Sequence, residues 1–462
     1  MAESLPSIEE RLQAEGIEIV RVSAKPGSVD DGHRTQQVVR ERSPAWVVLD
    51  GYRFDSEYQK LLKQTARRLL VIDDFGRAGQ YFANLVLDQN LGTEDAYYSH
   101  RAPYSRLLLG TAYIVLRRPF RVWKGHRVNA PRSAHHVLIT FGGIDKHNVT
   151  LVAVKALRRI STGSVEARIV VGSGNPQADA VQSLVQSLGH QFQVERDPED
   201  MAELMAWADL AVAAAGTTAW ELAYMGVPSL LVSTADNQMA VAQNLELAGA
   251  ATSLGESGSL TEESLAGAIT HLIEDGAERE SMSRKARALV DGHGVSKVLT
   301  EMRAAQVTLR RVQTEDARVL WTWRNDPLVR SVSFNEGPIP WDDHLKWFEA
   351  KENDPSCAFY VGLDDAGVPI GQIRFDQEGS EAEVSTSIDA KARGHGYGSG
   401  LILAGSRKLF GESRIRLLHA YVKPGNQASV RAFLKAGYRD AGRAMIRGHK
   451  ALHFVLEREV PA

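Results

Sequence analysis

Cysteine is almost absent from this sequence of 462 residues, which contains only Cys357. A single cysteine excludes an intrachain disulfide and a zinc site built from several cysteines, and such sparing use fits the reducing cytoplasm. We interpret Cys357 as a small buried hydrophobic residue, with a nucleophilic thiol as the alternative.

The sequence also lacks an excess of charge of one sign. Its 54 Lys and Arg residues nearly balance 57 Asp and Glu residues, which leaves a formal net charge of −3. Nucleic-acid backbones and anionic membranes are bound by strongly basic surfaces. We therefore expect no nucleic-acid partner.

Long apolar runs are missing as well. Runs such as "ADLAVAAAG" (Ala208 to Gly216) fall far short of the about 20 residues that cross a bilayer. The N-terminal stretch "MAESLPSIEERLQAEG" has no basic start followed by an apolar core, so it predicts a helix and not a secretory signal. We expect a cytoplasmic protein without membrane insertion.

The sequence does contain a repeated alternation of amphipathic helices with short β-rich runs, which is typical of βαβ units around a parallel sheet. The alternation occurs twice and predicts two Rossmann-like α/β domains, residues 1–130 with a basic linker and residues 131–305. The strand candidates of the first domain are "GIEIVRV" (16–22), "AWVVLD" (45–50), "RLLVIDD" (68–74) and "NLVLDQN" (84–90). Those of the second include "HVLIT" (136–140), "ARIVV" (167–171) and "ADLAVAAA" (208–215).

From about residue 306 the pattern changes. The stretch "VTLRRVQTEDARVLWTWRNDP" predicts a strand and then a helix, and "CAFYVGLDDAGVPIGQIRFD" predicts an antiparallel hairpin that turns at 364–367. We expect an α+β domain over residues 306–462.

Four glycines crowd the stretch "RGHGYGSG" (393–400), between the strand candidate "AEVSTSID" and the helix candidate "SGLILAGSRKLF". Glycines let the backbone approach a ligand closely, and a helix N-terminus favours an anion. The spacing is not that of the Rossmann G-x-G-x-x-G fingerprint, and the preceding strands do not have a parallel pattern. The stretch predicts a phosphate cradle, with a plain glycine-rich turn as the alternative.

Two motifs carry a resemblance to the GNAT-type N-acetyltransferases. Arg393-x-x-Gly396-x-Gly398 resembles the pyrophosphate loop of that family, and "NQASVRAFLKAGY" (426–438) resembles its later N-x-x-S motif. The resemblance implies acetyl-CoA as co-substrate and no metal. The residues it implies for the coenzyme are Arg393, Gly394, His395, Gly396, Tyr397, Gly398, Ser399 and Asn426.

Other roles in this domain follow from the same resemblance. Glu383 is a candidate general base, with a solvated strand residue as the alternative. Phe433 stands where many members have a tyrosine that protonates the leaving thiolate, so water or another group such as Tyr421 would have to serve. Arg324, in "LWTWRNDPLVRSVSF", is expected to meet a diphosphate or sugar oxygen.

The stretch "AAAGTTAWE" (213–221) predicts a strand end, a turn and a helix start that could bind a nucleotide. Capping and a helix-stabilising acid are the alternative. We expect a diphosphate at Gly216, Thr217 and Thr218, and a ribose diol at Glu221. Further strand-end candidates for this site are Gly142, Gly143, Asn237 and Gln238.

These segments resemble the nucleotide-binding half of GT-B-fold UDP-sugar enzymes. Over about residues 5–300 the chain is more closely similar to the UDP-2,4-diacetamido-2,4,6-trideoxy-β-L-altropyranose hydrolases of pseudaminic acid biosynthesis, through "VVLDGYRFD", "LVIDDFG", "FGGIDKHN" and "DNQ" in that order. That resemblance implies metal-free release of UDP, with Tyr52 at the catalytic cleft. The family's opening G-x-G-H-x-x-R loop is not found, so we expect a truncated first domain or a start placed too late. His33 is an alternative to the histidine of that loop.

The two resemblances together imply a bifunctional enzyme of pseudaminic acid (nonulosonate) biosynthesis. It would acetylate the 4-amino group of a UDP-linked amino sugar and then hydrolyse the diacetamido product. One alternative is an acetyltransferase with an inactive UDP-sugar-binding module, and another is a GT-B glycosyltransferase fused to an acetyltransferase. The pseudaminic and legionaminic series and the oligomeric state stay open.

Overall fold

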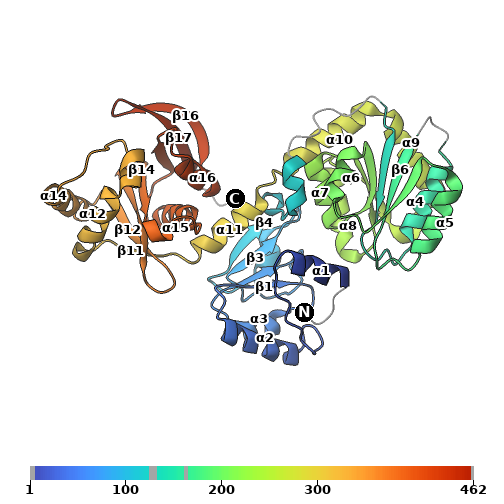
Figure 1. Ribbon diagram of the computed structural model, residues 1–462, viewed down its shortest axis with the longest axis horizontal. Coiled ribbons are helices and arrows are strands. Elements are labelled where there is room, and N and C mark those ends of the chain that lie inside the picture. The colour runs from blue at the N-terminus through green and yellow to red at the C-terminus, as the bar shows by residue number, and fades with distance from the viewer. Residues whose placement is uncertain (1–5, 124–132, 161–164, 459–462) are drawn as a thin grey trace. The chain divides into compact units, whose positions relative to one another are not determined.

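The computed structural model describes residues 6–123, 133–160 and 165–458, and the chain divides into two compact units, Met1–Val295 and Ser296–Ala462 (Figure 1). The described residues form two parallel sheets and one mixed sheet. This architecture confirms the predicted class, two Rossmann-like α/β parts followed by an α+β part. The predicted boundary at residues 130/131 lies outside the described residues.

The first sheet has four parallel strands in the order β1-β2-β3-β4. "GIEIVRV" was wrongly predicted as a strand: it is irregular, and Ile17 and Val20 are 50% and 38% exposed, so the run buries too little apolar surface to hold a strand. The other three candidates form strands, and the predicted N-terminal helix is present. The elements are α1 (Pro6–Ala14), α2 (Val29–Arg42), β1 (Val47–Asp50), α3 (Ser56–Lys63), β2 (Leu69–Ile72), β3 (Leu85–Asp88), η1 (Asp95–Tyr98), β4 (Arg106–Leu109) and η2 (Thr111–Tyr113).

The second sheet has six parallel strands in the order β10-β9-β8-β5-β6-β7. The chain runs outward from β5 to β7 and then crosses to β8, so the strand order reverses between β5 and β8. In sheets of this kind ligands bind at that switch point, outside the carboxyl ends of the strands. The strands are β5 (His136–Thr140), β6 (Glu166–Val171), β7 (Phe192–Arg196), β8 (Leu210–Ala214), β9 (Ser229–Ser233) and β10 (Thr252–Glu256).

Helices cover both faces of the second sheet (Figure 1). The core on one face takes in α4 (Val149–Arg158), α5 (Ala178–Leu188) and α9 (Glu262–Glu274), and the core on the other takes in α6 (Met201–Trp207), α7 (Thr217–Met225) and α8 (Asp236–Leu247). The unit also contains η4 (Ser257–Ser259) and α10 (Gly276–Leu289). The basic linker was expected over residues 117–136, and its first part contains the 3₁₀ helix η3 (Arg118–Trp123), which buries Phe120 in the second of these cores. That part of it is therefore packed structure.

The mixed sheet of the second unit has seven strands in the order β11-β12-β13-β14-β15-β17-β16. Its one parallel pair, β14 with β15, is in register only from Glu381 to Glu383 and from Leu417 to His419, and the two strands then part. The strands are β11 (Thr308–Arg311), β12 (Cys357–Leu363), β13 (Pro369–Glu378), β14 (Glu381–Ile388), β15 (Leu417–Val422), β16 (Arg439–Ile446) and β17 (His449–Glu457).

Two separate cores flank the mixed sheet. One contains α15 (Tyr397–Glu412) and α16 (Gln427–Lys435), and the other contains α12 (Ala317–Asn325) and α14 (Trp341–Glu352). The remaining elements are α11 (Gly294–Ala304), η5 (Thr314–Asp316), α13 (Pro327–Val332) and η6 (Ala390–Ala392). Cys357 is 4% exposed, as predicted, and burial raises the pKa of its thiol to about 11, which disfavours the nucleophilic thiolate.

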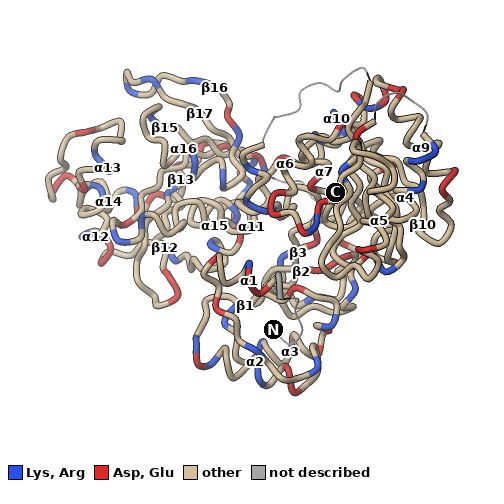
Figure 2. Tube along the Cα trace, turned by 45° about the vertical axis from the view of Figure 1, so that its right-hand side comes forward, with Lys and Arg blue, Asp and Glu red and all other residues tan. Residues whose placement is uncertain are grey.

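Basic and acidic residues alternate along the trace of each unit and do not separate by sign (Figure 2). Among the described residues, no helix combines the length and the apolar composition needed to cross a membrane.

Candidate functional sites

The predicted nucleotide-binding residues of the first unit gather at one edge of the second sheet. Gly142 and Gly143 follow β5, Gly216 follows β8, and Asn237 and Gln238 lie in the first turn of α8, after β9. Since β9, β8 and β5 are neighbours in the sheet, segments far apart in the sequence meet at the switch point.

The N-terminus of α7 is open at this edge. Gly216 is the N-cap residue and makes no side-chain capping bond, Thr217 is exposed and Thr218 is half-buried. Gln238 lies beside it, because a Cβ added at Gly216 would come within 3.5 Å of the Gln238 side-chain nitrogen. The Gln238 oxygen accepts hydrogen bonds from the backbone N–H and the hydroxyl of Thr234 at 2.9 and 3.0 Å, which fixes the amide. Backbone donors at a helix start suit a phosphate.

Glu221 lies one turn further along α7 and is 8% exposed. Both of its carboxylate oxygens accept from Arg117, at 2.7 Å from Nε and 3.0 Å from Nη2. The predicted ribose contact would therefore have to share the carboxylate with this bidentate ion pair.

Tyr52 follows β1 and is 60% exposed. Its hydroxyl donates to Oδ2 of Asp74 at 2.5 Å and accepts from Nδ2 of Asn237 at 2.8 Å. The Arg77 guanidinium lies 4.7 Å from the centre of the ring. Partial desolvation, followed by the hydrogen bond to Asp74, raises the pKa of Tyr52, so this phenol is a hydrogen-bond donor and a poor base. The predicted catalytic Tyr52 and the predicted substrate residue Asn237 are thus in direct contact.

The glycine stretch of the second unit forms the predicted loop between β14 and α15. Gly394 and Gly396 have φ of +81° and +82°, a conformation that favours glycine, and Gly396 caps α15 without a side-chain bond. Gly394, His395 and Gly396 are exposed, whereas Tyr397 and Gly398 are half-buried. Open backbone at the start of a 16-residue helix suits the pyrophosphate of a coenzyme.

Three residues predicted to hold the coenzyme also have contacts within the protein. Arg393 donates from Nε to the Ile388 carbonyl at 3.2 Å and pairs with Asp326 at 3.0 Å. Ser399 is 8% exposed and its hydroxyl donates to the Gly396 carbonyl at 3.2 Å. Asn426 caps α16 by accepting from the Ser429 N–H at 3.1 Å. These contacts shape the loop and the start of α16.

One face of the mixed sheet carries a chain of polar side chains where β14 and β15 part. Glu383 is exposed on β14 and pairs in register with His419 of β15. Nδ1 of His419 lies 2.9 Å from Nε2 of His453, and Nε2 of His419 lies 2.9 Å from Oε2 of Glu381. The Tyr421 ring stacks 4.8 Å from that of His453.

The protonation of this chain follows from hydrogen-bond chemistry. An ionised Glu381 can only accept, so His419 donates to it from Nε2, and when His419 is neutral its Nδ1 accepts from Nε2–H of His453. Nδ1 of His453 is then the lone-pair acceptor. Burial, and then the neighbouring His419, lower the pKa of His453, which favours this neutral form at neutral pH. Burial and then Glu383 raise the pKa of Tyr421.

Phe433 is 4% exposed and stacks with Phe454 in the core beside α15 and α16, so it is a packing residue. Arg324, on α12, donates from Nη2 to the Asn335 carbonyl at 2.7 Å. Burial and then the charges of Arg330 and Arg447 lower the pKa of Arg324. Whether Arg324 meets substrate stays a prediction.

Sequence reasoning missed several members of these sites. Arg117 follows no motif, and nothing in its neighbourhood indicates that it pairs with Glu221. Asp74 ends the strand-like stretch "RLLVIDD", so a strand-end carboxylate could have been singled out. His419 and His453 lie 34 positions apart, and only the strand pairing brings them together.

Two family models match the chain. Residues 136–298 match the glycosyltransferase family 28 C-terminal domain, and residues 306–439 match the acetyltransferase (GNAT) domain. The chain therefore joins a glycosyltransferase family 28-like domain to a GNAT acetyltransferase domain. This confirms the acetyltransferase and glycosyltransferase-like parts of the resemblance, while the pseudaminic acid hydrolase stays a prediction.

Individual relatives cover parts of the chain. The spore coat polysaccharide biosynthesis protein SpsG of Bacillus subtilis is 27% identical over 195 residues, which are 42% of this chain and 57% of the relative. The UDP-N-acetylglucosamine–N-acetylmuramyl-(pentapeptide) pyrophosphoryl-undecaprenol N-acetylglucosamine transferase of Methylococcus capsulatus is 36% identical over 179 residues, 38% of this chain and 49% of the relative. The chain thus spans about half the length of these two curated relatives. Among solved structures, the aminoglycoside acetyltransferase AAC(6')-Ib with paromomycin and acetyl-CoA is 20% identical and covers 33% of this chain and 94% of its own, with a TM-score of 0.30.

Proposed function

We propose that the second unit transfers the acetyl group of acetyl-CoA to an amino group of a UDP-linked sugar, and that the first unit binds a UDP-linked sugar. One observation carries the proposal: the open glycine loop at the start of α15 lies in the same domain as the place where β14 and β15 part beside a polar chain of histidines. The GNAT match over 306–439 supports the acetyl transfer. The glycosyltransferase match over 136–298 supports the nucleotide sugar.

The coenzyme fits the loop for a local reason. Gly394 and Gly396 leave backbone exposed at the N-terminus of α15, and an added Cβ at Gly394 would meet open space, so the backbone can face a pyrophosphate. The unpaired edges of β14 and β15 beyond Glu383 and His419 offer backbone groups to the rest of the coenzyme. Bound acetyl-CoA supplies an activated thioester.

The chain's own residues would manage the proton of the acceptor amine. Glu383 is the predicted base and is exposed at the parting strands. Nδ1 of His453 is the other candidate acceptor, since it carries a lone pair in the tautomer whose Nε2–H faces His419, and burial favours the neutral imidazole. Tyr421, stacked on His453, could return a proton to the leaving thiolate.

We further propose hydrolysis of the UDP-linked diacetamido sugar at the first unit, as in pseudaminic acid biosynthesis. Tyr52 supports this step as an oriented hydroxyl, because Asp74 and Asn237 hold it from two sides, and its O–H would turn from Asp74 to a sugar oxygen when substrate binds. Asn237 lies in the first turn of α8, at the same sheet edge as Gly216. A nucleotide there would place its sugar beside Tyr52.

Glycosyl transfer is the second candidate for the first unit. It is favoured by the match of residues 136–298 to a glycosyltransferase domain and by the relative from Methylococcus capsulatus, which is 36% identical. Under this proposal the residues at the carboxyl ends of β5, β8 and β9 still bind the nucleotide, and an acceptor sugar replaces water.

Two assays on the full chain test these proposals separately. Thiol release from acetyl-CoA is measured with the UDP-linked 4-amino sugar, and UDP release is measured with its diacetamido product, with and without a sugar acceptor. We expect thiol release that depends on the amino sugar. No thiol release with any UDP-linked amino sugar would contradict acetyl transfer, and UDP release only with an added acceptor would favour the glycosyltransferase.

A further inference from the structure

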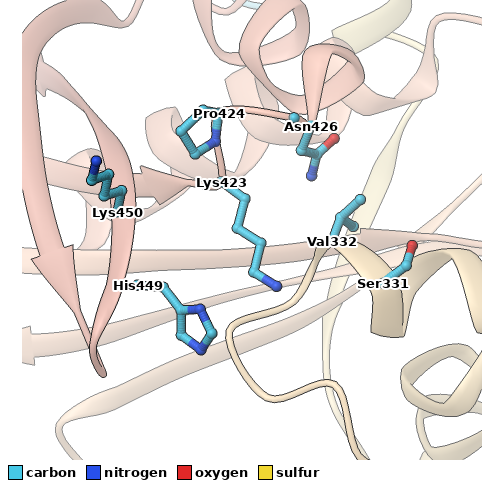
Figure 3. Close-up of a pocket in the computed structure, with 8 residues that line it drawn as sticks. Ser331, Val332, Lys423, Pro424, Asn426, His449 and Lys450 are labelled. Atoms are coloured by element: carbon cyan, nitrogen blue, oxygen red, sulfur yellow. The ribbon is translucent and has the colours of Figure 1, made fainter.

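A pocket of about 420 Å³ lies in the second unit, lined by the end of α13, the loop before α16 and the start of β17 (Figure 3). Lys423 extends into it from the loop, and His449 lines it from the start of β17 (Figure 3). Asn426 lies across from them, and Lys450 is directed along the hairpin. None of the described lining residues is acidic.

The described lining residues include no arginine, but guanidinium groups lie on and near α13, the helix whose end lines the pocket. Arg330, on α13, donates from Nε to the Glu336 carbonyl at 3.0 Å, and Arg324 donates from Nη2 to the Asn335 carbonyl at 2.7 Å. The charges of Arg330 and Arg447 act on Arg324, so the three lie near one another. Nη1 of Arg324 is buried and has no hydrogen-bond partner among the described residues. Clustered like charges with a buried unused donor are costly unless an anion joins them.

One carboxylate already pairs with the lysine of this pocket. The Lys423 ammonium pairs with Glu336, whose side chain is 61% exposed while that of Lys423 is 16% exposed. Glu336 therefore reaches in from the surface and meets a lysine that has little contact with water. A stronger anion could displace this carboxylate from Lys423.

We propose that the pocket binds the diphosphate of a nucleotide-linked acceptor during acetyl transfer. This inference rests on the proposed function and names the group by which the second unit would recognise its acceptor. Arginine and lysine together suit a diphosphate, whose oxygens accept several charged donors at once.

The strand geometry joins the pocket to the polar chain. Tyr421 pairs with His453 across β15 and β17, and Lys423 follows Tyr421 by two positions, in the loop directly after β15. Two residues along a strand span about 6–7 Å. An acceptor with its diphosphate at Lys423 would thus present its sugar toward His453.

Calorimetric titration of the full chain with UDP, in the presence of CoA, tests the pocket without relying on activity. We expect two UDP sites per chain, one in each unit. Lys423→Met should weaken one by at least 10-fold, and Glu221→Ala should weaken the other. Glu336→Gln should tighten the site that Lys423→Met weakens, because it removes the competing carboxylate. Lys346→Met, at an exposed lysine of α14, is the matched control.

In steady-state kinetics the same variant should change one constant and leave the others nearly unchanged. Lys423→Met should raise KM for the UDP-linked amino sugar at least 10-fold and leave KM for acetyl-CoA and kcat within about 3-fold. A single UDP site that Lys423→Met leaves intact would overturn the pocket, as would a rise in KM for acetyl-CoA alone. Two UDP sites without any acetyl transfer would overturn the proposed function and leave the pocket standing.

Discussion

The glycine loop of the second unit and the strand edge of the first unit are both helix starts at which we propose that phosphate binds, but they are assembled differently. The loop takes its residues from one stretch, Arg393 to Ser399. The edge takes them from three segments between Gly142 and Gln238, which meet because β5, β8 and β9 are neighbours.

This difference predicts different sensitivity to mutation. In the loop, Gly396 has a φ of +82° and presents the backbone itself, so one side chain can close the site. At the edge the binding groups are spread out and tied to partners, as Glu221 is to Arg117 and Tyr52 is to Asp74. Loss of one such group removes a contact and leaves the others in place.

The largest expected effect is at the loop. Gly396→Asp would place a carboxylate against the pyrophosphate and force an unfavourable backbone conformation, so acetyl-CoA should bind at least about 100-fold more weakly in calorimetry. Gly411→Asp is the control, because Gly411 is exposed in the same helix and an added Cβ meets nothing within 4 Å. Equal affinity of both variants and the wild type would remove the loop from the coenzyme site.

The next test asks whether the second unit also depends on residues brought together by its sheet. His453→Gln should lower kcat for acetyl transfer by about 10²-fold, the scale of general base catalysis, with KM for acetyl-CoA unchanged. The wild-type rate should fall as pH decreases, because protonation removes the lone pair of His453. The variant should lose this pH dependence. A variant with the wild-type pH profile would leave Glu383 as the base.

A smaller effect is expected at the strand edge. Glu221→Ala should weaken UDP by about 1–3 kcal/mol, the scale of a charged hydrogen bond, when protection against thermal unfolding is measured. Glu203→Ala, at an exposed position of α6, is the control. Arg117→Ala tests whether Glu221 contacts UDP or only stabilises the fold. If Arg117→Ala and Glu221→Ala lower the stability of the protein equally and neither changes the affinity for UDP, Glu221 only stabilises the fold.

The smallest effect is on stability, where acid should act on the two units with opposite sign. Burial raises the pKa of Asp88 in the first unit, so its folded form takes up a proton more readily and gains stability as pH falls toward about 4. Burial lowers the pKa of His344 in the second unit, so stability is lost as pH falls below about 6.5. Hydrogen exchange of each unit measures both slopes.

Asp88→Asn and His344→Gln should each reduce the pH dependence of stability in their own unit only. A flat slope in both units before mutation would show that other groups compensate for these two.

Much of the fold could be predicted from local pattern. The strands at 47–50, 69–72 and 85–88 and the hairpin at 364–367 follow from short β-rich runs and turn residues. "GIEIVRV" is also rich in β-branched residues but forms no strand, because strand formation requires burial against a core as well. Composition could not supply that information.

The sequence by itself determined the loop at 393–400, since glycines between a strand and a helix start predict exposed backbone there, and its role as an anion cradle stays a prediction. It also placed Gly216 and Asn237 at strand ends. Only the tertiary structure decided that Arg117 holds Glu221, that Asn237 meets Tyr52, and that His419 meets His453. Each of these pairs joins positions 34 to 185 apart in the chain, and a contact over that separation depends on strand order and register, which residue spacing does not encode.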